Sequence, residues 1–256
     1  MTTTPIEIAY GDAPEQVLDL HLAPDAATAP IVIYAHGGGF QRGDKTDHGP
    51  RLSMLASLGV NVASINYRLA PAHRHPAQVD DVRAAVAALR TRIAGEHGLD
   101  GTAIGAIGAS AGGFLVSSAA LGRSDAASAI QAASVWFASS DFLESARRSP
   151  LEERISPITY ERVLLGDDAG PAEFAAASPA RWNLSDAPPM LLVTGDSDKI
   201  VAPVQSAILH DALARGGRDS TLVRLAGVGH EDTAFDEAPL LGMVAAWFRG
   251  KLGGAK

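Results

Sequence analysis

The sequence predicts an α/β fold: a mostly parallel, doubly wound sheet with helices on both faces and a small insertion over the carboxyl edge of the strands. Short apolar runs of strand length alternate with helical patterns along most of the chain, and such alternation is typical of parallel sheets. The chain has 256 residues and is 46% hydrophobic. That is enough apolar material for the core of one domain covering residues 1–256.

The first half of the chain predicts two kinds of strand. Residues 6–10 and 17–22 alternate enough between apolar and polar side chains to form an opening antiparallel pair. Residues 30–35 (PIVIYA) form a continuous apolar run, which is typical of a strand buried on both faces. The other elements expected here are helices at 51–58, 77–94 and 113–121 and strands at 60–66 and 101–107.

A charged, proline-containing segment at 142–182 interrupts the alternation after a predicted strand at 132–138. Its four prolines are Pro150, Pro157, Pro171 and Pro179. Because it holds only short helical patches, we expect a small cap-like insertion lying over the carboxyl edge of the sheet. After it, the expected elements are strands at 189–194 and 220–225 and helices at 203–215 and 240–248.

The composition argues against several classes of function. The net charge is −8 and no Lys/Arg cluster is present, so we expect no nucleic-acid partner. The chain has no cysteine, which excludes disulfides and thiol nucleophiles, and we expect neither metal nor cofactor. No apolar run approaches the roughly 18 residues of a membrane span, and residues 1–11 lack a secretory signal, so we expect a cytoplasmic protein without membrane contact. The apolar stripe of the last predicted helix could form a homodimer interface or could pack on the core of the domain, and both interpretations stay open.

A serine stands at a predicted strand-to-helix corner in the segment 108–112, Gly-Ala-Ser-Ala-Gly. A serine at such a corner, with glycine two residues away on each side, is the nucleophile-elbow pattern. The glycines are needed because a side chain at either flanking position would crowd the neighbouring strand or helix. Ser110 is therefore the candidate nucleophile.

A run of three glycines follows the predicted strand at 30–35, in the segment His36-Gly37-Gly38-Gly39-Phe40. Carboxyl ends of parallel strands meet at one edge, where open α/β sheets place their sites. Unshielded backbone N–H groups of such a loop can approach an oxyanion closely. The segment therefore predicts an oxyanion hole, and His36 is expected to organise the loop.

An acid and a histidine follow the next two strand predictions. Asp196 and Asp198 stand after the strand at 189–194, and spacing alone does not decide which carboxylate would orient a catalytic imidazole. His230 lies in a glycine-containing loop after the strand at 220–225. Serine, acid and histidine thus occur in the chain order of α/β-hydrolases. His73 and His75 could together bind a metal, but no third ligand is nearby and we expect a solvated loop.

With these motifs, the sequence resembles the α/β-hydrolase-fold esterases, in the branch of hormone-sensitive-lipase-like and bacterial feruloyl- or acetyl-esterase-like enzymes. The resemblance spans residues 30–250 and rests on YAHGGGF (34–40), GDK (43–45), NYRLAP (66–71), PAQ (76–78), DDV (80–82), GASAGG (108–113), the acid segment with Val201 and Pro203, and GVGH (227–230). It implies Asp198 as the acid, three residues before Val201. It also implies an oxyanion hole built from the N–H groups of Gly38, Gly39 and Ala111.

We therefore expect a serine hydrolase, a carboxylesterase acting on short-chain acyl or aryl esters through an acyl-enzyme, with Ser110, Asp198 and His230 as the triad. The expected pocket residues are the aromatic side chains of Phe40, Trp136, Phe137 and Phe142. An arylformamidase or a carbohydrate acetyl or feruloyl esterase would use the same groups and stays an alternative. A non-catalytic ligand-binding member of the fold is a more distant one.

Overall fold

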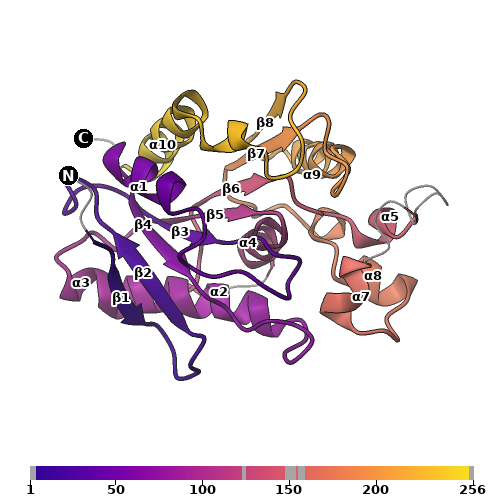
Figure 1. The fold of residues 1–256 in the computed structure, drawn as a ribbon, viewed down its shortest axis with the longest axis horizontal. Coiled ribbons are helices and arrows are strands. Elements are labelled where there is room, and N and C mark those ends of the chain that lie inside the picture. Colours follow the sequence, from indigo (N-terminus) through magenta and orange to yellow (C-terminus); the bar gives the residue numbers. More distant parts are fainter. Residues whose placement is uncertain (1–3, 123–124, 148–153, 155–158, 254–256) are drawn as a thin grey trace.

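Eight strands form one sheet in the order β1-β2-β4-β3-β5-β6-β7-β8 (Figure 1). The structure is a computed structural model, and it describes residues 4–122, 125–147, 154 and 159–253. The strands are β1 (Ile6–Ala9), β2 (Val17–His21), β3 (Ile31–Ala35), β4 (Asn61–Ile65), β5 (Ile104–Ala109), β6 (Ala132–Trp136), β7 (Met190–Gly195) and β8 (Ser220–Leu225). β2 pairs antiparallel with both β1 and β4, and all other pairs are parallel. The predicted fold class is confirmed.

Helices cover both faces of this sheet. They are α1 (Gly49–Ser57), α2 (Ala77–Ala88) continued by η1 (Leu89–Ile93) and α3 (Ala94–Glu96), α4 (Ala111–Leu121), α9 (Val204–Arg215), η3 (Thr233–Asp236) and α10 (Ala238–Leu252). α2, α4 and α9 pack on one face, and α1 and α10 pack on the other (Figure 1). Each helix therefore lies near its expected position.

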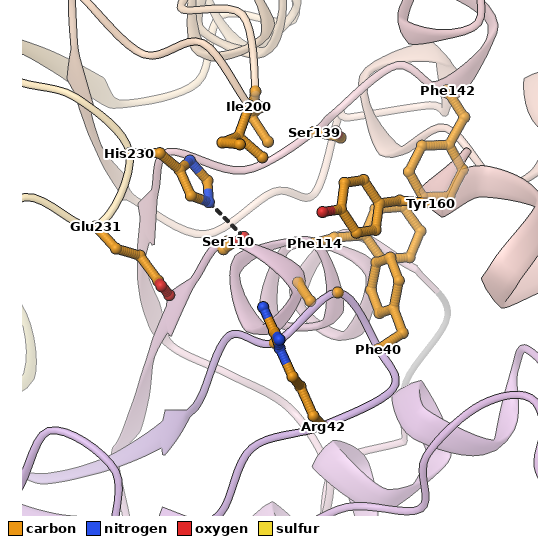
Figure 2. Close-up of a pocket in the computed structure, with 14 residues that line it drawn as sticks. Phe40, Arg42, Ser110, Phe114, Ser139, Phe142, Tyr160, Ile200, His230 and Glu231 are labelled. Carbon is orange, nitrogen blue, oxygen red and sulfur yellow. Dashed lines mark hydrogen bonds between the residues drawn. The ribbon is translucent and has the colours of Figure 1, made fainter. Parts of the chain in front are cut away.

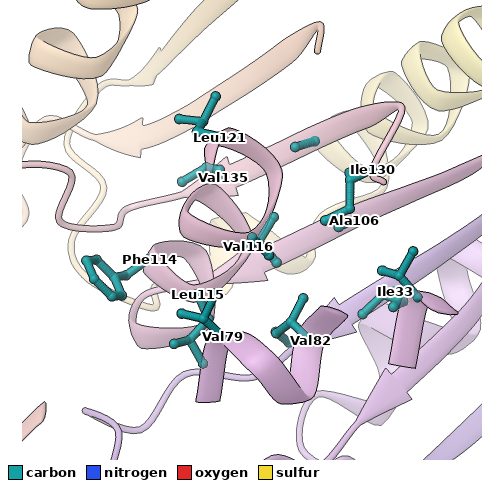
Figure 3. Close-up of a cluster of buried hydrophobic side chains, with 14 of the residues drawn as sticks. Ile33, Val79, Val82, Ala106, Phe114, Leu115, Val116, Leu121, Ile130 and Val135 are labelled. Carbon is teal, nitrogen blue, oxygen red and sulfur yellow. The ribbon is translucent and has the colours of Figure 1, made fainter. Parts of the chain in front are cut away.

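The two buried clusters follow from the alternation of side chains along each strand. In β3, Ile31 and Ile33 face the α2/α4 layer, and Val32 and Tyr34 face the α1/α10 layer. Figure 3 shows the first cluster, in which Val79 and Val82 of α2 and Leu115 and Val116 of α4 lie over Ile33 and Ala106. Because the central strands are buried on both faces, their sequences read as continuous apolar runs.

The segment at 142–182 contains α5 (Phe142–Ser145), α7 (Tyr160–Leu165), α8 (Pro171–Ala176) and η2 (Pro179–Arg181), grouped beside the sheet (Figure 1). Pro150 and Pro157 lie outside the described residues. Two contacts close the base of the segment: Asp141 pairs with Arg181 at 2.7 Å, and Ala180 N–H donates to Ser140. Below we call it the cap segment.

None of the helices in the described ranges is long and apolar enough to cross a membrane.

Asp81 on α2 is a buried carboxylate that ties three segments together. It accepts hydrogen bonds from the Arg68 guanidinium and backbone N–H and from Gln16, at 2.6–3.0 Å. Replacing it with alanine leaves the Arg68 guanidinium without its carboxylate partner, and breaking such a pair is strongly destabilising. We expect Asp81→Ala to lower the free energy of unfolding by about 3 kcal/mol, measured by urea denaturation.

The neighbouring Asp80 offers the matched control. Its side chain is 55% exposed and lies 3.7 Å from Arg83, and exposed pairs of this kind contribute about 0–1 kcal/mol. Equal losses for Asp80→Ala and Asp81→Ala would contradict a role for the buried network.

Candidate active site

Ser110 occupies a strained corner between β5 and α4. Its backbone has φ 54° and ψ −118°, a conformation that non-glycine residues rarely adopt. The corner closes tightly: a side chain at Gly108 would lie 2.2 Å from the Gly112 carbonyl oxygen, and one at Gly112 would lie 2.1 Å from the Ala35 oxygen. The two glycines are therefore needed for β5 and α4 to meet, and the predicted elbow geometry is present.

Ser110, His230 and Asp198 form a continuous hydrogen-bonded chain. Ser110 Oγ lies 2.9 Å from His230 Nε2, and His230 Nδ1 lies 2.7 Å from Asp198 Oδ2. The Asp198 side chain is fully buried and that of His230 is 12% exposed. With Nδ1–H donating to the carboxylate, Nε2 is free to accept the serine proton.

The structure brings Asp198, and not Asp196, to the imidazole. The other oxygen of Asp198 accepts the N–H groups of Ile200 and Val201 at 2.8 and 2.9 Å, which fixes the carboxylate. Asp196 instead accepts the Gly227 N–H at 2.8 Å. It therefore braces the loop that carries His230.

The glycine loop after β3 is supported from beneath by aromatic stacking. The His36 ring stacks on Tyr67 with centroids 4.4 Å apart, and Tyr67 Oη donates to the His36 carbonyl at 2.9 Å. His36 Nδ1 also lies 2.7 Å from the Gly37 oxygen. Burial lowers the pKa of the His36 imidazole, so the neutral ring is favoured at this position. His36 organises the loop, as expected.

Three backbone N–H groups are available beside Ser110. Gly38 and Gly39 have φ values of 112° and 61°, which expose their amides on a turn closed by Arg42 N–H donating to the Gly38 oxygen. In the described part of the chain, neither the Gly38 nor the Gly39 N–H donates a hydrogen bond to the protein. Ala111 is the first residue of α4, so its N–H has no partner within the helix.

A cavity of about 280 Å³ opens over Ser110 (Figure 2). Residues from several parts of the chain line it: Gly38, Gly39, Phe40 and Arg42 of the glycine loop; Ser110, Ala111 and Phe114 of the elbow; Ser139 after β6; Phe142 and Tyr160 of the cap segment; and Ile200, Val201, His230 and Glu231. Phe114 stacks on Phe142 at 4.3 Å, and Phe40 meets Phe114 edge-on at 5.6 Å. One end of the cavity is therefore aromatic.

Phe40 and Phe142 lie where the sequence predicted, but Trp136 and Phe137 do not. Trp136 points to the α1/α10 face of the sheet, where its ring stacks on Phe235 under the Arg51 guanidinium. Phe137 is fully buried behind the triad and meets the His230 ring edge-on at 4.9 Å. The expectation that these two line the cavity is corrected, because strand alternation directs Trp136 away from it and Phe137 supports the histidine instead.

Several lining residues were missed by sequence reasoning. Tyr160 comes from the cap segment, where no periodic pattern marks it, and its ring lies where a Gly39 side chain would be. Arg42 and Glu231 lie four residues after Gly38 and directly after His230. Their position next to the predicted glycine loop and histidine loop was the one sequence signal for Arg42 and Glu231.

The His73/His75 pair gives no metal site in the described residues, where no group of three or more His, Cys, Asp or Glu side chains converges. The His75 ring is half-buried against Phe114, with centroids 6.3 Å apart, so it is not the solvated side chain that we expected. Burial lowers its pKa.

The fold, the elbow serine and the Ser–His–Asp chain define the class: an α/β-hydrolase-fold protein with the arrangement of a serine hydrolase. The chain belongs to the BD-FAE family, whose model matches residues 18–213. It is 32% identical over 247 residues to the esterase LipQ of Mycobacterium tuberculosis, covering 91% of this chain and 57% of LipQ. The chain thus spans little more than half the length of this curated relative.

Solved structures of esterases share the fold. A truncated carbohydrate esterase from gut microbiota superposes with a TM-score of 0.85 at 22% identity, covering 98% of this chain and 96% of that one. An esterase from the Planctomycetes species Thermogutta terrifontis gives a TM-score of 0.77 at 22% identity, covering 96% and 92%. At this identity the likeness concerns the fold.

Proposed function

We propose that this protein is a serine carboxylesterase that cleaves short-chain acyl or aryl esters through an acyl-enzyme. The observation that carries the proposal is the chain from Ser110 Oγ through His230 to the buried Asp198, beside three available backbone N–H groups. The named relatives, which include the esterases LipQ and LipC, support it.

In this mechanism His230 Nε2 removes the Ser110 hydroxyl proton while Oγ attacks the ester carbonyl carbon. Asp198 stabilises the imidazolium that forms, and the N–H groups of Gly38, Gly39 and Ala111 hold the carbonyl oxygen as it becomes an oxyanion. His230 then gives its proton to the departing alcohol, which leaves the acyl group on Ser110. In the second half, His230 takes a proton from water while the water oxygen attacks the acyl carbon. His230 then returns that proton to Ser110 Oγ as the bond between Oγ and the acyl carbon breaks, and the carboxylic acid leaves.

The cavity supports small substrates. Its volume of about 280 Å³ lies just below that of typical ligand pockets, which is about 300–1,000 Å³. Phe40, Phe114 and Phe142 give one end a flat apolar wall. The esterase from Thermogutta terrifontis that shares this fold has been solved with propionate and with butyrate bound, which agrees with a short acyl chain.

A substrate panel tests the proposal. We expect acetyl and butyryl p-nitrophenyl esters to be cleaved faster than the decanoyl ester, and a fluorophosphonate probe to label Ser110. A decanoyl preference would contradict the short-chain assignment, and absence of labelling would favour a non-catalytic binding protein. Feruloyl, acetyl-xylan and N-formyl-kynurenine substrates in the same panel separate the carbohydrate esterase and arylformamidase alternatives.

Gly38→Ala is expected to remove one oxyanion donor. A methyl group there would lie 2.0 Å from the Arg42 carbonyl oxygen, and φ 112° is unfavourable for alanine, so the turn must move. Loss of one such donor typically costs about 10²–10³ in kcat, and we expect a drop of that size on p-nitrophenyl acetate with a smaller change in KM. Steady-state kinetics measures both.

Gly49→Ala is the control for this variant, because a side chain at Gly49 would have no atom within 4 Å apart from its chain neighbours and its own helix, and its backbone is not left-handed. It should keep wild-type kcat. An unchanged kcat in a folded Gly38→Ala protein would contradict the assignment of Gly38 to the oxyanion hole.

Three expectations from the sequence are not needed for this mechanism and stay predictions. They are a single domain over residues 1–256, a cytoplasmic location and a homodimer.

A further inference from the structure

Two charged side chains at the mouth of the cavity have no part in the proposed mechanism. Arg42 lies on the glycine-loop side and Glu231 on the histidine side of Ser110 (Figure 2). Both residues are exposed. Across the described residues, the Arg42 guanidinium forms neither an ion pair within 4.0 Å nor a hydrogen bond, and it therefore does not pair with Glu231.

Arg42 is held in place by the same turn that exposes the oxyanion donors. Its backbone N–H donates to the Gly38 oxygen at 3.2 Å, and its own Cγ lies 3.1 Å from the position of a Gly38 side chain. Figure 2 shows the guanidinium extending from this turn toward Ser110. The turn therefore fixes the backbone of Arg42 at the edge of the site, and the exposed side chain carries its charge from there.

The cavity lining carries both a positive and a negative side chain, Arg42 and Glu231. The glycine-loop wall carries Arg42 and the N–H groups of Gly38 and Gly39, all of which favour an anion. Glu231 follows His230 in the chain, and its Oε1 lies 2.6 Å from the position of a Gly37 side chain, at the start of the same loop. In a protein with a net charge of −8, an anionic ligand is repelled in general and attracted only at such a local positive site.

We propose that Arg42 is a specificity-determining residue that binds a carboxylate on the ester substrate, so the site prefers anionic esters over neutral ones of the same shape. The inference rests on the proposed esterase function and deepens it. The carboxylate could belong to the acyl group or to the alcohol. An arginine guanidinium binds either through two parallel N–H···O bonds.

Two matched substrate pairs test the inference on the full chain. 4-Acetoxybenzoate and 4-acetoxybenzamide differ by one charge on the leaving group, and mono-p-nitrophenyl adipate and p-nitrophenyl hexanoate differ by one charge on the acyl group. For each pair the readout is the ratio of kcat/KM for the anionic ester to kcat/KM for the neutral one. Arg42→Ala should lower this ratio about 10-fold in one of the pairs, the size expected of a partly exposed charge-assisted hydrogen bond.

Arg215→Ala is the matched control, since it removes one exposed positive charge at the end of α9, the end farther from the catalytic edge. Its ratios should equal those of the wild type. Arg42→Lys should keep part of the preference, and added salt should weaken it in the wild type.

The outcomes separate this inference from the function on which it rests. An Arg42→Ala protein whose ratios are unchanged in both pairs overturns the inference, and so does one that loses anionic and neutral turnover equally, which would make Arg42 a general stabiliser of the oxyanion. Failure of the wild-type protein to cleave any of the four esters overturns the esterase function itself.

Discussion

The Ser110→Ala protein is expected to fold and to lose about 10⁴–10⁶ of kcat on p-nitrophenyl acetate, as removal of a triad serine does elsewhere. Among the described residues, the Ser110 side chain forms one hydrogen bond, to His230 at 2.9 Å, so little of the packing depends on the hydroxyl. Turnover and fluorophosphonate labelling measure the loss, and circular dichroism checks the fold. A folded Ser110→Ala protein that kept its turnover would exclude Ser110 as the nucleophile.

Ser110→Gly is the informative companion. The φ of 54° and ψ of −118° are unfavourable for serine and alanine alike but open to glycine, and residues in such regions store about 1–3 kcal/mol of strain. We therefore expect the glycine variant to be equally inactive and no less stable than the alanine variant in urea denaturation. A clearly less stable glycine variant would show that the corner is not strained.

The strands and most groups of the candidate site could be predicted because strong local constraints act on them. The runs that became β3, β5 and β7 are buried on both faces, so nearly every position is apolar. Parallel strands end at one edge, and that geometry brought Ser110 and His230 together across 120 residues of chain. The glycines at 108 and 112 gave the elbow around Ser110 a recognisable sequence pattern.

The choice between Asp196 and Asp198 could not be made from local spacing, because both stand in the same turn after β7. Three-dimensional contacts separate them: one carboxylate reaches the imidazole, and the other accepts a loop N–H. The resemblance to known esterases pointed to Asp198 because the family pattern places its acid three residues before the valine that Val201 matches.

The pocket was the least predictable part. The run that ends in Trp136 and Phe137 is apolar at nearly every position, so its alternation does not show which side chain faces the site. Tyr160 comes from the irregular cap segment. Arg42 and Glu231 are of residue types common on any surface, and only their placement around Ser110 makes them notable.

Asp198→Asn is expected to reduce kcat by about 10²–10⁴ while leaving the fold intact. An asparagine can still accept the N–H groups of Ile200 and Val201 through its one oxygen. Its NH₂ group then faces His230 Nδ1, which becomes an acceptor, and the ring proton moves to Nε2. In that tautomer the imidazole no longer accepts the Ser110 proton.

Asp196→Asn is the matched control, two residues away in the same turn. Its oxygen can keep the hydrogen bond from the Gly227 N–H, and the residue is exposed and does not touch the imidazole. We expect the kcat of Asp196→Asn to stay within about threefold of wild type, since substitutions of exposed residues that do not touch the catalytic groups have small effects. Steady-state kinetics on p-nitrophenyl acetate compares the two variants, and a larger loss for Asp196→Asn than for Asp198→Asn would reverse the assignment of the acid.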